Sequence, residues 1–254
     1  MTAVTDQFLL TGKVALVTGG SRGLGRAMVK AFAQAGADVV ITSRTAAACQ
    51  ALAAEVEQET GRSALAVGCH VGHWDELPDL LDAAYDRFGR LDVLVNNAGK
   101  SPLYPSLAEV DERLWDSVLA VNLKGPFRLT ALAGERMAAG EGGSIVNISS
   151  IAAVHPRPEA LPYAAAKAGL NAMTAGFALA YGPRVRVNAI MAGPFLTDVS
   201  KAWDMAAFQR SAQAHALQRG SEPSEIVGAA LYFASDASRF TTGSVLAVDG
   251  GVPQ

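Results

Sequence analysis

The segment Thr18-Gly19-Gly20-Ser21-Arg22-Gly23-Leu24-Gly25 is the most informative part of the chain. It lies between the apolar run Lys13–Thr18, typical of a buried strand, and Leu24–Ala35, whose pattern predicts a helix. Glycines in such a turn let the backbone approach a pyrophosphate, which binds the N–H groups that open the helix. The spacing is G-x-x-x-G-x-G, not the general G-x-G-x-x-G, and an ordinary glycine-rich turn is the alternative. Its position between strand and helix favours dinucleotide binding.

The same alternation of strand and helix continues along nearly the whole chain. Short runs of Val, Ile and Leu are continuous, as expected for parallel strands that are buried on both faces. The predicted strands are Lys13–Thr18, Asp38–Ser43, Ser63–Cys69, Leu91–Val95, Ser144–Ser149, Arg184–Ile190 and Ser244–Val248. The predicted helices are Leu24–Ala35, Ala46–Thr60, Trp74–Phe88, Arg113–Ala139, Tyr163–Tyr181 and Pro223–Ala234. This pattern predicts an α/β fold: a doubly wound, Rossmann-type parallel sheet of about seven strands, with helices on both faces and residues 1–254 as one domain.

Composition excludes several other classes of protein. The 254 residues are 50% hydrophobic and 18% charged, which argues against a disordered chain. A net charge of −3 gives no electrostatic reason to expect nucleic acid or an anionic membrane surface as a partner. Two cysteines cannot form a disulfide framework, and the opening residues lack the basic start of a signal peptide. We therefore expect a cytoplasmic protein.

The end of the second predicted strand bears on the choice of cofactor. An Asp or Glu about 20 residues after the glycines binds the ribose 2′-hydroxyl of NAD. Here the strand ends in Ser43-Arg44, without an acid. The guanidinium groups of Arg44 and Arg22 suit a 2′-phosphate, which favours NADP(H) over NAD(H). Two solvated loop arginines are the alternative.

Two further motifs follow strands. Asn96-Asn97-Ala98-Gly99 offers small residues for close approach to an adenosine, and asparagine side chains that can link strands. Tyr163 and Lys167 are four residues apart on a predicted helix and so share a face. A lysine ammonium beside a phenol lowers the pKa of the phenol, which makes Tyr163 a candidate proton donor and acceptor. Segments 19–25, 96–99, 149–150 and 191–197 all follow the carboxyl ends of strands, the edge where such sheets bind ligands.

With these motifs in this order, the chain resembles the short-chain dehydrogenase/reductase family over residues 11–251. The resemblance selects Ser150, thirteen residues before Tyr163, over Ser149, and adds Asn122 and the ending Val248-Asp249-Gly250-Gly251. It implies that Tyr163 transfers the hydroxyl proton, Ser150 binds the substrate oxygen, Lys167 lowers the tyrosine pKa and holds the nicotinamide ribose, and Asn122 anchors a water. The expected cofactor-binding residues are Gly19, Ser21, Arg22, Gly23, Leu24, Gly25, Ser43, Arg44, His70, Val71, Asn97, Ala98, Gly99, Tyr163, Lys167, Gly193, Phe195 and Thr197.

The chain departs from the family pattern at two places. His70-Val71 stands where the family commonly has Asp-Val, so adenine contacts must rely on His70 or on the backbone. Met191-Ala192-Gly193-Pro194 stands where Pro-Gly is usual, so the turn that places Phe195 and Thr197 against the nicotinamide differs in detail. Cys69, His70 and His73 superficially resemble metal ligands, but no second cluster completes four-coordination, and we expect no metal.

These observations lead to a set of expectations. The chain is expected to be an NADP(H)-dependent oxidoreductase that interconverts a small-molecule ketone or aldehyde with an alcohol. An NAD-linked alcohol dehydrogenase and a catalytically idle dinucleotide-binding regulator are the alternatives. We expect a mobile substrate lid over residues 194–216, rich in apolar side chains, which favours a hydrophobic or aromatic ketone. The resemblance suggests a homotetramer, with small residues of the Tyr163–Tyr181 helix in a subunit contact.

Overall fold

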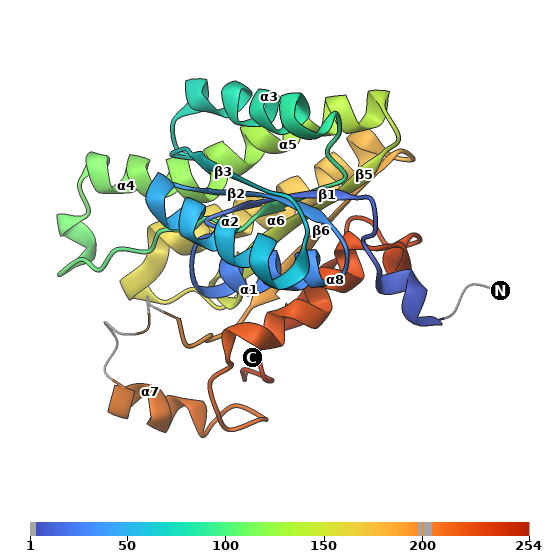
Figure 1. Ribbon diagram of the computed structural model, residues 1–254. Helices are drawn as coiled ribbons and strands as arrows, with labels where there is room; N and C mark the ends of the chain where they lie inside the picture. Colours follow the sequence, from blue (N-terminus) through green and yellow to red (C-terminus); the bar gives the residue numbers. More distant parts are fainter. Residues whose placement is uncertain (1–3, 198–199, 201–204, 254) are drawn as a thin grey trace.

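The computed structural model describes residues 4–197, 200 and 205–253 (Figure 1). Seven parallel strands form one sheet in the order β3-β2-β1-β4-β5-β6-β7, which confirms the doubly wound prediction. The order reverses between β1 and β4, the kind of switch point at which open α/β sheets bind ligands. The strands are β1 (Val14–Thr18), β2 (Asp38–Ser43), β3 (Ala64–Gly68), β4 (Val93–Asn96), β5 (Gly143–Ser150), β6 (Val185–Ala192) and β7 (Val245–Val248).

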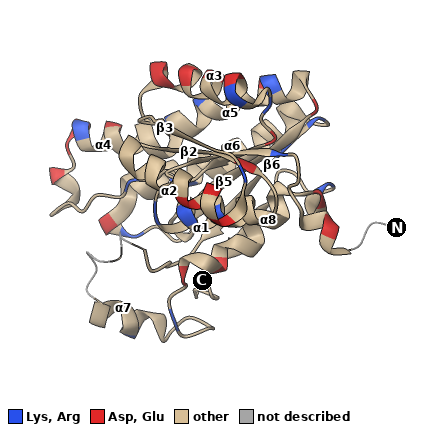
Figure 2. Cartoon of the chain, in the orientation of Figure 1, with Lys and Arg blue, Asp and Glu red and all other residues tan. Residues whose placement is uncertain are grey.

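Helices cover both faces of this sheet (Figure 1). One buried apolar cluster joins the sheet to α1, α2 and α8, and a second joins its other face to α3, α5 and α6. The helices are α1 (Gly23–Gln34), α2 (Ala46–Thr60), α3 (Leu77–Phe88), α4 (Glu112–Leu119), α5 (Gly125–Ala139), α6 (Leu161–Tyr181), α7 (Met205–Ala212) and α8 (Val227–Ala234). In the view of Figure 2, acidic and basic side chains are interspersed on the outer helices.

Strand β1 shows why the predicted strands consist of consecutive apolar residues. Ala15 and Val17 belong to the cluster on one face, whereas Val14 and Leu16 belong to the cluster on the other. Because successive strand side chains point to opposite faces, burial on both faces favours apolar residues at successive positions.

One predicted helix, Arg113–Ala139, is interrupted. It consists of α4, a π-helical turn over Ala120–Lys124, and α5. Pro126 has no N–H, so it cannot donate to the Asn122 carbonyl four residues earlier, as a regular α-helix requires. The irregular turn therefore lies around Asn122, in keeping with the frequent occurrence of π turns at functional sites.

Most other boundaries lie within two residues of the prediction. The predicted helices Trp74–Phe88 and Pro223–Ala234 each begin with a short 3₁₀ turn, Trp74–Glu76 and Pro223–Ile226. Gly61 ends α2 in the left-handed conformation with φ 66°, which glycine adopts without strain. In the irregular stretch after β6, the described part contains α7, which lies away from the sheet in Figure 1.

Candidate functional site

The glycine turn between β1 and α1 brings backbone segments into direct contact. Gly19 and Gly23 have φ of 61° and 53°, which L side chains rarely adopt. A Cβ on Gly25 would lie 2.2 Å from the Gly19 carbonyl oxygen and 2.7 Å from Nδ2 of Asn97. No larger residue fits at Gly25, and the Arg22 side chain does not cap the start of α1, an end that favours anions.

The Asn96–Gly99 segment is fastened to this turn. The Asn97 side chain donates to the carbonyl oxygens of Thr18, at 2.8 Å, and Gly19, at 3.2 Å. The Thr18 hydroxyl accepts from the backbone N–H groups of Asn97 and Ala98, each at 3.0 Å. Asn96 Nδ2 donates to Asn147 Oδ1 at 2.9 Å and so links β4 to β5, as expected for these asparagines. Thr18 therefore holds the Asn96–Gly99 segment against the glycine turn, a role that was not predicted from the sequence.

The end of β2 contacts the glycine turn next to Arg22 and Arg44, the two candidates for binding a 2′-phosphate. The hydroxyl of Ser21 donates to Oγ of Ser43 at 3.1 Å, which joins the two segments. Arg22 and Arg44 are both exposed. Neither guanidinium has a carboxylate partner in the described part of the chain, which leaves both available to an anion.

His70 lies at the next strand end, and its ring is held by its own loop. Nδ1 accepts from the Gly72 N–H at 3.1 Å, and the ring stacks on His73 with 4.2 Å between centroids. Burial is the main cause that lowers the pKa of His70, and the neighbouring His73 and Arg44 lower it further. His73 pairs with Glu76 at 2.6 Å. Among the described residues, no group of three or more His, Cys, Asp or Glu side chains forms a metal site.

Ser150, Tyr163 and Lys167 meet where β5 ends and α6 begins. Ser149 is buried and its hydroxyl donates to the Lys167 carbonyl at 3.5 Å, whereas the Ser150 hydroxyl lies near enough to Tyr163 to lower the pKa of the phenol in part. The structure therefore places Ser150, not Ser149, beside the tyrosine. Lys167 is 3% exposed, and its ammonium donates to the Ile148 carbonyl at 2.7 Å.

The electrostatics of this group differ from the sequence-based expectation. Burial raises the pKa of the Tyr163 hydroxyl, and the neighbouring Ser150 hydroxyl lowers it in part. The net direction is upward, so in this structure Lys167 does not depress the pKa of the tyrosine below its usual value. Burial also lowers the pKa of Lys167 to about 8, because the charged ammonium is costly to remove from water.

The Asn122 side chain holds the segment that follows β4. Nδ2 donates to the carbonyls of Lys100, at 2.7 Å, and Val118, at 2.9 Å, and Oδ1 accepts from the Lys100 N–H at 3.2 Å. Both polar atoms of the Asn122 amide are therefore bonded to the protein, and the side chain holds the Lys100 loop against α4. Because Pro126 has no N–H, the backbone carbonyl of Asn122 lacks its usual helical donor.

The segment after β6 returns to the glycine turn. A Cβ on Gly23 would lie 3.4 Å from Cγ2 of Thr197, so these two candidate residues adjoin. The Phe195 side chain is 5% exposed and belongs to the apolar cluster of α1 and α8. Gly193 has no room for a Cβ, which would lie 2.5 Å from Cα of Asp249.

The predicted lid is described only in part. Its first residues pair with the chain beyond it, because Leu196 N–H donates to the Ser221 carbonyl at 2.8 Å. Its last residues pair with the C-terminal segment through Ala216 and Gly251, at 3.0 Å. The predicted lid residues Asp198, Val199, Lys201, Trp203 and Asp204 lie outside the described residues.

Fold and strand-end residues together define a class: a dinucleotide-binding oxidoreductase built on a doubly wound sheet. A family model described as enoyl-(acyl carrier protein) reductase matches residues 19–253, and relatives over nearly the full length are named as short-chain dehydrogenases/reductases. The chain belongs to the short-chain dehydrogenase/reductase family and is an NAD(P)-dependent oxidoreductase that acts on small molecules.

Its relatives include enzymes with different substrates. It is 37% identical to a D-threitol dehydrogenase of Mycolicibacterium smegmatis, over 98% of this chain and 96% of that one. It is 35% identical to a 3-oxoacyl-[acyl-carrier-protein] reductase of Thermotoga maritima, over 96% and 98%. The solved structure of an NADPH-dependent 3-quinuclidinone reductase from Rhodotorula rubra superposes with a TM-score of 0.94 at 29% identity, over 99% and 95%. In the described part of the chain, no helix has the length and apolar character that crossing a membrane requires.

Proposed function

We propose that this protein is an NADP(H)-dependent oxidoreductase that interconverts a ketone or aldehyde with an alcohol. The observation that carries the proposal is that the hydroxyls of Ser150 and Tyr163 adjoin at the carboxyl edge of the sheet, with the Lys167 ammonium 5.6 Å from the centre of the Tyr163 ring. A protonated phenol beside a serine hydroxyl provides two donors for one carbonyl oxygen, which is the arrangement that carbonyl reduction needs.

Each side chain has a separate role in this proposal. Tyr163 gives its proton to the substrate oxygen in reduction and takes it back in oxidation. Ser150 donates a hydrogen bond to the same oxygen and orients it. Lys167 supplies positive charge that stabilises the phenolate left behind, and Asn122 offers its backbone carbonyl to a water on the route by which the proton is replaced.

The residues present fit a nicotinamide dinucleotide. Gly19 and Gly23 adopt positive φ, and Gly25 lets the turn pack closely against the Gly19 carbonyl and Asn97, which is the tight glycine turn that a pyrophosphate-binding loop requires. Arg22 and Arg44 would bind a 2′-phosphate, and Lys167 would hold the ribose. The cofactor supplies hydride transfer when it is bound; the protein supplies position and charge.

Two alternatives differ in measurable ways. An NAD-linked alcohol dehydrogenase would share the proton-transfer residues and differ at the 2′ end, where the absence of an acid near Ser43 favours NADP. An idle dinucleotide-binding regulator would not need Ser150, Tyr163, Lys167 and Asn122, all of which are present. The test is NADPH oxidation with a panel of aliphatic and aromatic ketones. No turnover of any ketone or aldehyde, with NADPH bound, would favour the regulator.

For the substrate, we propose a hydrophobic or aromatic ketone under a lid formed by residues 194–216. Apolar side chains of the described part, among them Leu196 and Phe208, approach each other across Gly220. We expect hydrogen exchange in this segment to slow when NADPH and a ketone bind together, since lids of this kind close on ligands. Equal exchange with and without ligands would mean that these side chains are structural.

A further inference from the structure

The loop that follows β3, residues 69–76, holds the ring of His70 in one orientation; we call it the histidine loop. The His70 N–H donates to Oε2 of Glu76 at 2.9 Å, and Oε1 of the same carboxylate lies 2.6 Å from Nδ1 of His73. The His73 N–H donates to the His70 carbonyl at 2.8 Å, and the two imidazole rings stack. A Cβ on Gly72 would lie 3.0 Å from Cε1 of His70, so the loop closes tightly around the ring.

The hydrogen bonds of the His70 ring decide which of its nitrogens carries the proton. Nδ1 accepts from the Gly72 N–H at 3.1 Å. A neutral imidazole has one donor nitrogen and one acceptor nitrogen, so the proton lies on Nε2. Burial, together with His73 and Arg44, lowers the pKa of His70, which favours this neutral form. Within the described part of the chain, the Nε2–H of this half-buried ring has no acceptor.

His70 lies at the end of a row of three strand ends. The Cys69 N–H donates to the Ser43 carbonyl at 3.0 Å, which joins the histidine loop to the strand that carries Arg44. The sheet order β3-β2-β1 continues this row to the glycine turn. In a dinucleotide the pyrophosphate, the adenosine ribose and the base also follow one another, and the first two suit the ends of β1 and β2. The base is therefore expected at the end of β3.

The polar groups that His70 and Arg44 offer at this place are both hydrogen-bond donors. A guanidinium has donors only, and His70 presents its Nε2–H. Both oxygens of Glu76 are already occupied by the histidine loop. A base edge that binds His70 must therefore supply an acceptor, such as N1 of adenine or O6 of a 6-oxopurine.

We infer that His70 determines specificity for the cofactor base: its Nε2–H donates to an acceptor atom of the base, and the site accepts a purine with or without a 6-amino group. Glu76 is the positioning residue that holds the loop and, with it, the ring. The inference rests on the proposed NADP(H)-dependent activity and specifies how such an enzyme recognises the adenosine half of its cofactor. A carboxylate at position 70 would act in the opposite way, since it only accepts and would select the amino group.

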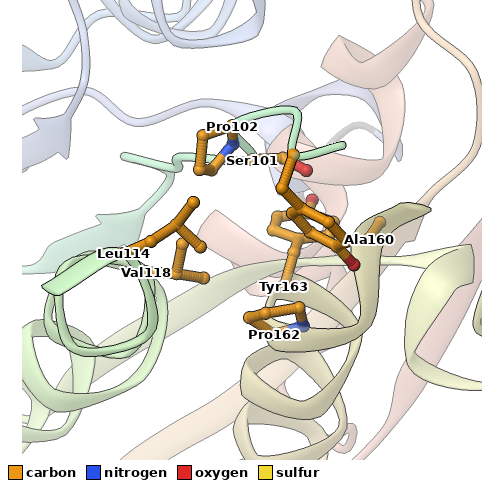
Figure 3. A pocket seen from close by; sticks show the side chains of 8 residues that line it. Ser101, Pro102, Leu114, Val118, Ala160, Pro162 and Tyr163 are labelled. Carbon is orange, nitrogen blue, oxygen red and sulfur yellow. The ribbon is translucent and has the colours of Figure 1, made fainter. Parts of the chain in front are cut away.

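The proposed proton donor lies in a different part of the site. Pro162 and Tyr163 at the start of α6 line a narrow apolar space together with Leu114 and Val118 of α4 (Figure 3). None of the described residues that line this space belongs to the histidine loop. Variants in the loop therefore change the base end of the site and leave these surroundings of Tyr163 intact.

The first test compares NADPH with its hypoxanthine analogue, in which oxygen replaces the 6-amino group of adenine. For the wild-type protein, we expect fluorescence titrations to give dissociation constants within about threefold of each other. In His70→Asp the adenine cofactor should bind about ten- to a hundredfold more tightly than the analogue, because a carboxylate accepts from the amino group and repels the oxygen. His155→Asp, which places the same carboxylate at a half-buried histidine after β5, is the matched control and should keep the wild-type ratio.

The second test locates the proton on His70 directly. Long-range proton–nitrogen NMR spectra of the free protein should show Nε2 protonated and Nδ1 bare, with His70→Asn identifying the signals. Adding adenosine 2′,5′-bisphosphate should shift the Nε2 resonance and slow the exchange of its proton. A proton on Nδ1, or an Nε2 resonance that this fragment leaves unchanged, overturns the donor role of His70.

The third test releases the histidine loop. In Glu76→Ala we expect NADPH and adenosine 2′,5′-bisphosphate to bind about tenfold more weakly, because the bonds to the charged carboxylate are lost. Nicotinamide mononucleotide, which lacks the adenosine half, should bind as before, and kcat at saturating NADPH should stay close to the wild-type value. Asp75→Ala removes an exposed carboxylate that forms no hydrogen bond within the described residues, and it should change none of these constants. Equal weakening of both fragments in Glu76→Ala overturns the positioning role.

The outcomes separate this inference from the proposed function. If the wild-type protein binds both purine cofactors alike but reduces no carbonyl compound, the proposed activity fails and the role of His70 stands. If ketones are reduced but the wild-type protein prefers adenine by about tenfold or more, the role of His70 alone is overturned. The same conclusion follows if His70→Asp creates no preference for adenine. Failure to bind either cofactor overturns both.

Discussion

The Lys167 ammonium lies 5.6 Å from the centre of the Tyr163 ring, one helical turn further along α6. It is buried and donates to the Ile148 carbonyl at 2.7 Å, so its position is fixed by the end of β5. Burial lowers the pKa of Lys167 to about 8, while burial raises the pKa of Tyr163 above its usual value. The two groups are thus both protonated at neutral pH, as carbonyl reduction requires.

We expect the reduction rate to fall as the pH rises through about 8. Lys167 is charged below that pH and neutral above it, and a neutral lysine no longer stabilises the phenolate that forms on Tyr163. Tyr163 itself stays protonated throughout this range because its pKa is raised. Measured at saturating NADPH, kcat/KM for a ketone should drop about tenfold per pH unit on the alkaline side.

The control for this profile is Lys124→Met, which removes an exposed lysine on the neighbouring π turn and should keep the alkaline limb in place. Lys167→Arg should move the limb to higher pH, because a guanidinium stays charged. A wild-type rate that is constant up to pH 10 would contradict the role of Lys167.

Tyr163→Phe tests the proton donor directly. General acid catalysis contributes about 10²–10⁴-fold, so we expect turnover to fall by this factor while NADPH binds with nearly unchanged affinity. Steady-state rates and a fluorescence titration with NADPH measure the two quantities. Near-normal turnover in this variant would show that another group supplies the proton.

The architecture could be predicted because both faces of the sheet are buried, which leaves continuous apolar runs such as Val14–Val17 in the sequence. In a parallel sheet the glycine turn and the other segments that follow the strands then lie at the same edge. The break in the predicted helix Arg113–Ala139 was missed, although Pro126 carried a signal: it removes a donor from the Asn122 carbonyl.

The electrostatics and long-range contacts of the site could not be predicted in the same way. The sign of the Tyr163 pKa shift depends on how much water reaches its hydroxyl, which is a property of packing. Phe195 follows a strand end near other site residues, yet it packs into the core because α1 and α8 offer an apolar surface there. The link from Tyr104 to Leu161 joins loops whose proximity no local pattern encodes.

Arg44→Asp tests the preference for NADPH. Hydrogen bonds to charged groups contribute about 1.5–3 kcal/mol, so losing the contact with the 2′-phosphate should weaken NADPH binding roughly ten- to a hundredfold. The new carboxylate should accept from the 2′-hydroxyl and improve NADH binding. Fluorescence titrations with both cofactors measure the change, with Arg239→Asp, an exposed arginine near β7, as the control. Equal wild-type affinity for NADH and NADPH would refute the preference.

The outer face of α6 supports the proposed homotetramer. The small residues expected in a subunit contact are all exposed, so they do not pack against their own sheet: Ala168, Ala172, Ala175, Gly176 and Ala180. Leu179 on the same helix is 86% exposed. At edge strand β7, Val245 and Leu246 are 42% and 40% exposed. Large apolar exposure beside a row of small residues is typical of a surface that another subunit covers.

We therefore expect light scattering at micromolar concentration to give a mass about four times the 26.3 kDa of the chain. Ala175→Glu should split the tetramer, because a carboxylate buried between two closely packed helices loses its hydration without gaining a partner. Ala51→Glu changes an alanine on α2 that is also exposed and should leave the mass unchanged. The thermal midpoint of Ala175→Glu should also fall, since a subunit that binds only the folded chain stabilises it by mass action. A wild-type monomer, or a tetramer that survives Ala175→Glu, would mean that the exposed face of α6 is not a subunit contact.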